Sequence, residues 1–343
     1  MKYYKISEKP FSVHGLIMPE DGSRYSRIPE DIAKNTNDGV AWLNYNTAGG
    51  RVRFRTDSKV IGLKAVYPTD VWKYPNMPPM AQFGFDLYAG SDDGGRYCGS
   101  FVADIGEDKI SRGEIHFDTS EERELTVFFP IYCDVADVEI GIEDGATLSA
   151  HSSYKHKRPV VYYGSSITQG ASAGRPGLAY SALISRRLDT EFTNLGFSGS
   201  AKGEPVMAEY IASLDMSVFV MDYDHNAETS EMLQKTHEPF YKIIRDAQPD
   251  TPIIFVTRPD FHEPVNASSD DDARRRREVV RATYKRAVAA GDKNVCFIDG
   301  GLFARDLPVY LRDICTQDGC HPTGAGFMFM AKDIGDAIER ALE

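Results

Sequence analysis

The sequence predicts two domains of different classes, an all-β domain followed by an α/β domain with a parallel sheet. Up to about residue 150, short apolar segments alternate with period two, and Gly, Pro, Asp and Asn interrupt them. After residue 159, short and nearly continuous apolar runs alternate with longer helix-like stretches. We place the boundary so that the domains span residues 1–155 and 156–343.

The first half contains five segments with the pattern of half-buried strands and no segment with a convincing helical stripe. Many short strands separated by turn signals indicate a β-sandwich, similar to a jelly roll. Residues 67–80 are too rich in proline for a strand and carry large apolar groups, so we expect a long ordered loop there. The five expected strands are 51–55, 60–66, 83–89, 123–129 and 138–142.

The second half alternates five expected strands with five expected helices. This order is typical of a parallel sheet covered on both faces, in which a ligand binds at the carboxyl ends of the strands. The strands are predicted at 160–163, 192–195, 217–222, 252–257 and 294–299. The helices are predicted at 178–188, 205–213, 229–247, 270–290 and 324–341.

Charge and composition narrow the choice of partners. The 343 residues include 39 basic and 51 acidic side chains, and the net charge of −12 argues against nucleic acid or an anionic membrane. The first ten residues lack the apolar core of a signal peptide, and no later segment has the length of a membrane span. The five cysteines are scattered without metal-ligand spacing. We therefore expect a cytoplasmic protein with reduced thiols, no metal and no cofactor; the oligomeric state is not indicated.

Ser166 is the candidate nucleophile. It follows an apolar strand in G-S-S-I-T (164–168), where its hydroxyl can face a cleft and its backbone N–H an oxyanion. Gly-Ser pairs fill many ordinary turns, so this motif alone is weak. The G-x-S-x-G elbow of the α/β-hydrolases is absent.

Asp318 and His321 form a candidate carboxylate–imidazole pair in D-G-C-H-P (318–322). Their spacing lets the carboxylate reach Nδ1 and leaves Nε2 to accept a proton from serine. An Asp that caps the last helix, with a surface His beside it, is the alternative.

Gly199 and Asn226 are candidate oxyanion donors, because each follows an expected strand. The alternatives are a plain turn at Gly199 and a loop cap at Asn226. D-Y-D-H-N (222–226) also resembles the start of a calcium loop, but Ala227 replaces the turn glycine and no Glu follows in register.

These four blocks together resemble the SGNH (GDSL-type) hydrolases, over residues of about 160–343. The resemblance implies a flavodoxin-like sheet, a Ser166–His321–Asp318 triad, and an oxyanion hole formed by the Ser166 N–H, the Gly199 N–H and the Asn226 amide. Two departures mark a divergent branch. Ser165 replaces the Asp of G-D-S, and Ala227 replaces the Asp that follows the Asn.

The first half is similar to the small domain that precedes one such branch, named for a G-x-D-L-Y string. Here the string is G-F-D-L-Y, at residues 84–88, which also fits a core strand. A β-sandwich joined to an SGNH domain resembles carbohydrate esterases that remove acetyl groups from plant polysaccharides or their oligosaccharides.

We therefore predict an O-acyl esterase, with an acetylated sugar as substrate. The alternatives are a lipase or thioesterase of the same fold, and a carbohydrate-binding protein with a vestigial site. Trp72, Tyr74 and Arg175 are candidate substrate-binding residues. We predict that the loop 67–80, with Tyr67, Trp72 and Tyr74, lines one wall of the cleft; the alternative is that its aromatic side chains only pack the domain interface.

Overall fold

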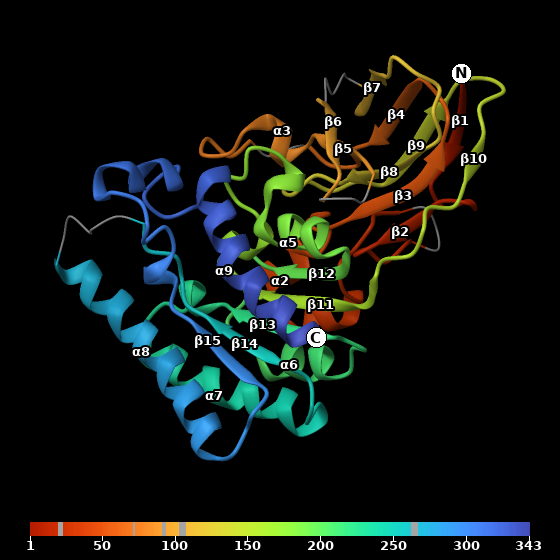
Figure 1. The fold of residues 1–343 in the computed structure, drawn as a ribbon. Coiled ribbons are helices and arrows are strands. Elements are labelled where there is room, and N and C mark those ends of the chain that lie inside the picture. Colours follow the sequence, from red (N-terminus) through yellow and green to blue (C-terminus); the bar gives the residue numbers. More distant parts are fainter. Residues whose placement is uncertain (20–22, 71–72, 91–93, 103–107, 262–266) are drawn as a thin grey trace.

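The computed structural model describes residues 1–343 except 20–22, 71–72, 91–93, 103–107 and 262–266, and it gives no side-chain description for 267–270. Two antiparallel sheets form the first domain and one parallel sheet forms the second (Figure 1). Among the described helices, none is both long enough and apolar enough to cross a membrane.

The β domain is a sandwich, as predicted. Its first sheet has the order β1 (Lys2–Lys5), β9 (Asp137–Ile142), β4 (Val60–Val66) and β7 (Ile110–His116). The second has the order β10 (Leu148–Ser149), β3 (Arg51–Thr56), β8 (Arg123–Phe128), β5 (Phe85–Ala89) and β6 (Arg96–Phe101), and β2 (Ser12–His14) pairs with β3. Side chains of both sheets, such as Phe54 and Leu63, share one apolar core. The period-two pattern of the sequence places these side chains inside.

The parallel sheet has the order β12 (Thr190–Gly196), β11 (His156–Gly164), β13 (Val218–Asp222), β14 (Ile253–Val256) and β15 (Val295–Ile298). This is the 2-1-3-4-5 order of a flavodoxin-like domain. Strand β11 divides its side chains between two cores: Val160 and Tyr162 belong to one, and Val161 and Tyr163 to the other. Burial on both faces explains why the predicted strands are nearly continuous apolar runs.

Helices cover both faces of this sheet (Figure 1). One face is covered by α5 (Tyr180–Leu188) and α9 (Gly324–Leu342), and the other by α6 (Pro205–Ala212), α7 (Ser230–Ala247) and α8 (Ala267–Ala289). The short helix α4 (Ser166–Gln169) follows β11, and short 3₁₀ segments lie at Pro176–Leu178 (η2), Asp224–Asn226 (η3), Gly300–Leu302 (η4) and Val309–Cys315 (η5). All five helices that the sequence predicts are present.

The first half also contains helices, which the sequence analysis did not expect. Helices α1 (Glu30–Thr36) and α2 (Asp38–Leu43) place Ala33, Val40 and Leu43 in the core of the second domain, and α3 (Pro79–Gln82) lies in the long loop. These helices have only four to seven residues, which is too short to show a helical stripe. The segment that contains α1 and α2 therefore packs with the second domain, although it lies within residues 1–155.

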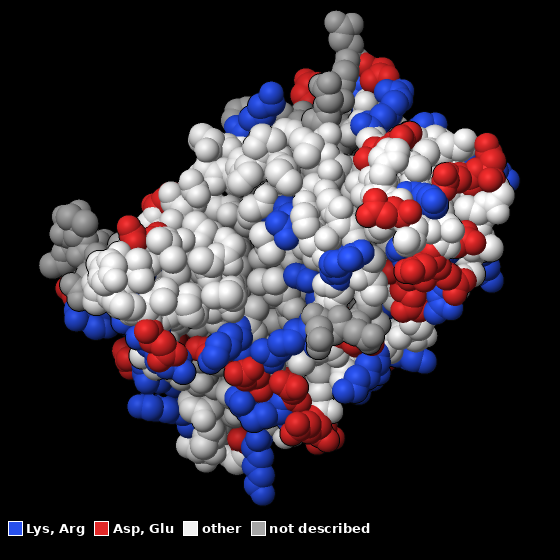
Figure 2. Space-filling model, turned by 45° about the horizontal axis from the view of Figure 1, so that its top comes forward, with Lys and Arg blue, Asp and Glu red and all other residues white. Residues whose placement is uncertain are grey.

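The face in Figure 2 carries interspersed basic and acidic side chains. The upper part of its left half, on the side where η5 lies in Figure 1, is mostly uncharged, whereas charged side chains gather below it. Val309, Tyr310 and Ile314 of η5 are among the exposed apolar side chains.

Candidate active site

Tight packing at the end of β11 places Ser166. A Cβ atom on Gly164 would lie 2.0 Å from Thr168 Oγ1 of α4 and 2.2 Å from Asp222 O of β13, so only glycine fits between this helix and this strand. Ser165 then caps α4, because its hydroxyl accepts a hydrogen bond from the Ile167 N–H at 3.2 Å. The Ser that replaces the usual Asp thus has a structural role. Ser166 is the first residue of α4 and is largely buried.

A hydrogen-bonded chain joins Ser166, His321 and Asp318. Ser166 Oγ lies 2.9 Å from His321 Nε2, and His321 Nδ1 lies 2.8 Å from Asp318 Oδ2. Asp318 Oδ1 also accepts hydrogen bonds from the backbone N–H groups of His321 (2.8 Å) and Cys320 (3.1 Å). Burial raises the pKa of Asp318, but these hydrogen bonds outweigh burial and hold the pKa well below its usual value. Asp318 is therefore ionised and can fix the imidazole tautomer that accepts the serine proton.

Asn76 of the long loop also contacts this chain. Its side-chain amide donates a hydrogen bond to Asp318 Oδ2 at 2.9 Å, and its carbonyl accepts one from Ser172 Oγ at 2.9 Å. In Figure 1 the segment around α3 lies beside the start of α9, which agrees with this contact. The β domain thus reaches the candidate site. Asn76 could not be predicted from the sequence, since a hydrogen bond across 242 residues leaves no local pattern.

A thiol–imidazole pair lies beside the same histidine. His225 Nε2 is 2.9 Å from Cys320 Sγ. Burial raises the pKa of Cys320, but hydrogen bonds to His225 and His321 outweigh burial and lower the pKa to about 6. Burial likewise lowers the pKa of His321, but the Cys320 thiolate and Asp318 outweigh burial and raise that pKa to about 9. The motifs D-Y-D-H-N and D-G-C-H-P contain both residues, and sequence reasoning gave neither a role.

Gly199 and Asn226 lie together, but they bond to each other. The Gly199 N–H donates to Asn226 Oδ1 at 3.1 Å. The Asn226 amide nitrogen donates to Phe197 O at 2.9 Å and Ala201 O at 3.1 Å. Both predicted donors therefore already have protein acceptors in this arrangement. The backbone N–H of Ser166 opens α4, where N–H groups have no acceptor within the helix.

The candidate substrate-binding residues have different surroundings. Trp72 lies outside the described residues. Tyr74 is half-buried and packs edge-on against Tyr132, with ring centroids 5.3 Å apart. Tyr67 is fully buried and donates a hydrogen bond to Phe83 O at 2.5 Å. Its ring therefore packs inside the protein and does not line a cleft, contrary to the prediction.

Arg175 is directed to the β domain rather than to the hydrogen-bonded chain. Its guanidinium group stacks on Tyr97 at 3.8 Å, and its Nε lies 3.4 Å from Asp86 Oδ2. Asp86 belongs to the G-F-D-L-Y string, and it also accepts a hydrogen bond from the Gly177 N–H at 2.9 Å. A Cβ atom on Gly177 would lie 2.4 Å from Tyr88 Oη. The string therefore docks the β domain onto the loop after Ser166.

The fold and the site together define the class of protein. Residues 157–339 match the GDSL-like lipase/acylhydrolase family, and residues 1–148 match the GxDLY family, described as the N-terminus of SGNH-hydrolase-type esterases. The chain belongs to the GDSL-like lipase/acylhydrolase family, in the branch with a GxDLY domain, as the sequence predicts. Membership in this family supports ester hydrolysis.

Solved structures show the same fold over the whole chain. A putative GDSL-like lipase from Bacteroides ovatus is 29% identical, with a TM-score of 0.87, and the alignment covers 99% of this chain and 98% of that one. A salicylyl-acyltransferase of a tetracycline biosynthetic pathway is 20% identical, with a TM-score of 0.77 and coverages of 99% and 96%. A family two carbohydrate esterase from Clostridium thermocellum, in complex with cellohexaose, is 14% identical, with a TM-score of 0.63 and coverages of 97% and 99%. No curated protein sequence matches the chain significantly.

Proposed function

We propose that the protein is a serine esterase that removes O-acetyl groups from a carbohydrate through an acyl-enzyme on Ser166. The observation that carries the proposal is the continuous chain of hydrogen bonds from Ser166 Oγ through His321 to Asp318, at 2.9 and 2.8 Å. Membership in the acylhydrolase family and the fold shared with a carbohydrate esterase support it. The restriction to acetyl groups rests on the resemblance to carbohydrate esterases.

In the proposed reaction, Ser166 Oγ attacks the ester carbonyl carbon while His321 Nε2 takes the hydroxyl proton. The tetrahedral intermediate collapses, and His321 returns this proton to the sugar oxygen that leaves. Water then attacks the acyl-enzyme, again with His321 as base, and releases acetate and the free serine. Asp318 holds the imidazole and stabilises its charged form in both steps.

The negative oxygen of the intermediate needs hydrogen-bond donors. We assign the first to the Ser166 N–H at the start of α4. The Gly199 N–H and the Asn226 amide are the other two proposed donors. Before the Gly199 N–H can donate to the oxyanion, Asn226 Oδ1 has to release it. Before the Asn226 amide nitrogen can donate, it has to break its hydrogen bond to Phe197 O or Ala201 O.

The sugar side of the cleft is proposed to lie against the loop 67–80. The hydrogen bond from Asn76 to Asp318 supports this placement, because it brings the loop to the candidate triad. Tyr74 belongs to this loop, and its role in substrate binding, like that of Arg175, stays a prediction.

Three substrates separate the candidate functions: p-nitrophenyl acetate, p-nitrophenyl octanoate and an acetylated xylo-oligosaccharide. We expect turnover of the acetyl ester and release of acetate from the oligosaccharide, with octanoate the poorest substrate. Higher kcat/KM for octanoate would indicate a lipase, and oligosaccharide binding without turnover a vestigial site. An added alcohol acceptor shows whether the acyl group passes to water or to the alcohol.

A further inference from the structure

A cavity lies at the seam between the two domains, away from Ser166. The cavity has a volume of about 290 Å³. Its lining comes from both domains: Ser12 and His14 of β2, Arg53 of β3, residues 150–154, Lys157, and Glu191 of β12. Strand β11 begins at His156 on this side and ends at Gly164 next to Ser166. The cavity therefore faces the amino ends of the parallel strands, opposite the candidate active site.

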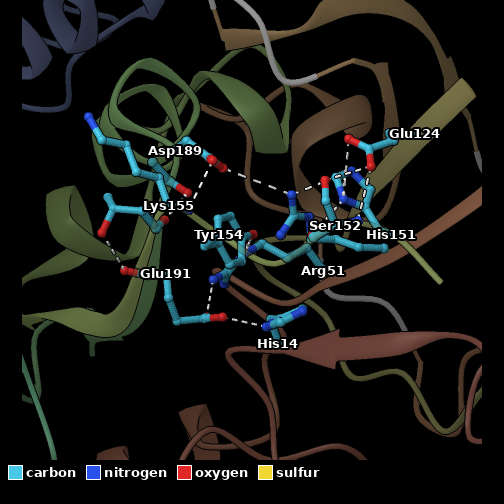
Figure 3. Close-up of polar contacts among 12 residues, drawn as sticks. His14, Arg51, Glu124, His151, Ser152, Tyr154, Lys155, Asp189 and Glu191 are labelled. Carbon is cyan, nitrogen blue, oxygen red and sulfur yellow. Dashed lines mark hydrogen bonds and ion pairs between the residues drawn. The ribbon is translucent and has the colours of Figure 1, made fainter.

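Two buried arginines on the same face of β3 differ in their partners. Arg51 is fully buried and all parts of its guanidinium group are bonded (Figure 3). Its Nε donates to Tyr154 Oη at 2.8 Å, its Nη1 to the carbonyls of Gly49 (2.7 Å) and Phe192 (3.1 Å), and its Nη2 to Glu191. The positive charge of Arg51 is thus neutralised within the protein.

Arg53 is only 4% exposed, yet in the described part of the chain its guanidinium group has no oxygen acceptor within hydrogen-bond distance. The nearest carboxylate oxygen is Asp189 Oδ1, at 3.9 Å. Its Nη2 lies 3.4 Å from His151 Nε2, its Nε has no partner, and its plane stacks on Tyr154 at 3.7 Å. A buried charge with so few partners is unfavourable unless a ligand supplies the missing hydrogen-bond acceptors and the opposite charge.

The surrounding groups favour an anion of low charge. Glu191 is already paired with Arg51 and His14 (Figure 3). Glu124 is paired with Arg55 and Ser152. Burial lowers the pKa values of His14 and His151, so both imidazoles are neutral at pH 7. Lys157 adds a second cation, with no ion pair among the described residues. Glu191 lines the cavity and Asp189 Oδ1 lies 3.9 Å from Arg53 Nη2, so these two negative charges disfavour a dianion such as phosphate.

We propose that this seam cavity binds a small organic carboxylate through the guanidinium group of Arg53. A planar guanidinium matches a carboxylate with two parallel hydrogen bonds. The volume is at the lower end of the range for small-molecule sites, so the ligand is of the size of a uronic acid. Because segments of both domains line the cavity, the bound carboxylate stabilises their docking.

Glucuronate is the probe, and glucose with matched NaCl is the neutral control. We expect the melting temperature of the wild type, of Ser166→Ala and of the exposed-site control Arg112→Met to rise with glucuronate and not with glucose. Arg53→Met abolishes the rise. An equal rise in Arg53→Met, or none in the wild type, overturns the proposal. Tighter binding of phosphate than of glucuronate by calorimetry overturns the carboxylate assignment.

Two further variants, Lys157→Met and Arg51→Met, test the proposal even if Arg53→Met does not fold normally. Lys157→Met changes an exposed side chain, and we expect it to weaken glucuronate binding at least threefold; an unchanged Kd counts against the site. Without glucuronate, Arg53→Met should melt no lower than the wild type, whereas Arg51→Met should melt several degrees lower, since it leaves Glu191 without its partner. A similar loss in both variants would show that Arg53 is only structural.

Discussion

Asn76 of the β domain and Asp318 of the candidate triad are joined by a hydrogen bond of 2.9 Å. The bond ties the long loop of the first domain to the carboxylate that orients His321. It gives the β domain a direct part in the site, in addition to the docking contact between Asp86 and Gly177.

Asn76→Ala should lower kcat on p-nitrophenyl acetate by about five- to tenfold, which corresponds to about 1 kcal/mol, the net contribution of a typical hydrogen bond. The small ester does not reach far along the cleft, so KM should change little. Ser172→Ala, which removes the donor to the Asn76 carbonyl, is the control for loop position. A kcat of Asn76→Ala equal to that of the wild type would restrict Asn76 to a packing role.

Cys320→Ala should move the acidic limb of the kcat/KM profile to lower pH. His321 must be neutral to accept the serine proton, and the Cys320 thiolate and Asp318 raise its pKa to about 9 against burial. An imidazole without such neighbours titrates near 6.5. Removing the thiolate takes away one of the two anions, so the neutral form persists at lower pH.

Cys296→Ala, a half-buried thiol elsewhere in the fold, is the matched control for this profile. An acidic limb that keeps its midpoint in Cys320→Ala would mean that the thiol does not influence the base.

Asn226→Ala should reduce kcat by about 10²- to 10³-fold with little change in KM, as expected of an oxyanion donor. The same residue also holds the Gly199 N–H, so the melting temperature must be measured in parallel. A lower melting temperature with only a small loss of kcat would assign Asn226 to the support of the loop.

Asp86 should make stability depend on pH. Burial raises its pKa to about 6, although Ser100, Gly177 and Arg175 oppose the shift. Because the folded-state pKa is above the unfolded one, the stabilising contribution is full below pH of about 4 and is lost as the pH rises through about 6. The rise of the pKa from 3.8 to about 6 corresponds to about 3 kcal/mol of stability.

The free energy of unfolding of the wild type and Asp86→Asn, measured in urea from pH 4 to 7.5, isolates this group. The free energy of unfolding of the wild type relative to that of Asp86→Asn should fall as the pH rises from 4 through about 6. Parallel curves would show that Asp86 titrates normally.

The strands and long helices could be predicted because burial imposes a period on them. Runs such as 217–222 are buried on both faces, and α7 and α9 are long enough to show an apolar stripe. Helices α1 and α2 could not be predicted in this way, since they are short and share an apolar core with residues of the second domain, such as Leu195 and Phe197.

The residues of the candidate site also fall into a group that the sequence predicts and a group that it does not. Ser166, Asp318 and His321 lie in local motifs, and the structure brings them together. Asn76 and the pairing of His225 with Cys320 depend on tertiary contacts that local motifs do not encode. The mutual bond between Gly199 and Asn226 is a matter of side-chain orientation, which the order of motifs leaves open.

The most direct test of the account is the site of covalent labelling by a fluorophosphonate, which traps an activated serine. After digestion, mass spectrometry should find one label per chain, on the peptide that contains Ser166. The label should disappear in Ser166→Ala and form far more slowly in His321→Ala, because the imidazole activates the hydroxyl. Wild-type protein that stays unlabelled, or that carries the label on Cys320 or another residue, would contradict the assignment of Ser166 as the nucleophile.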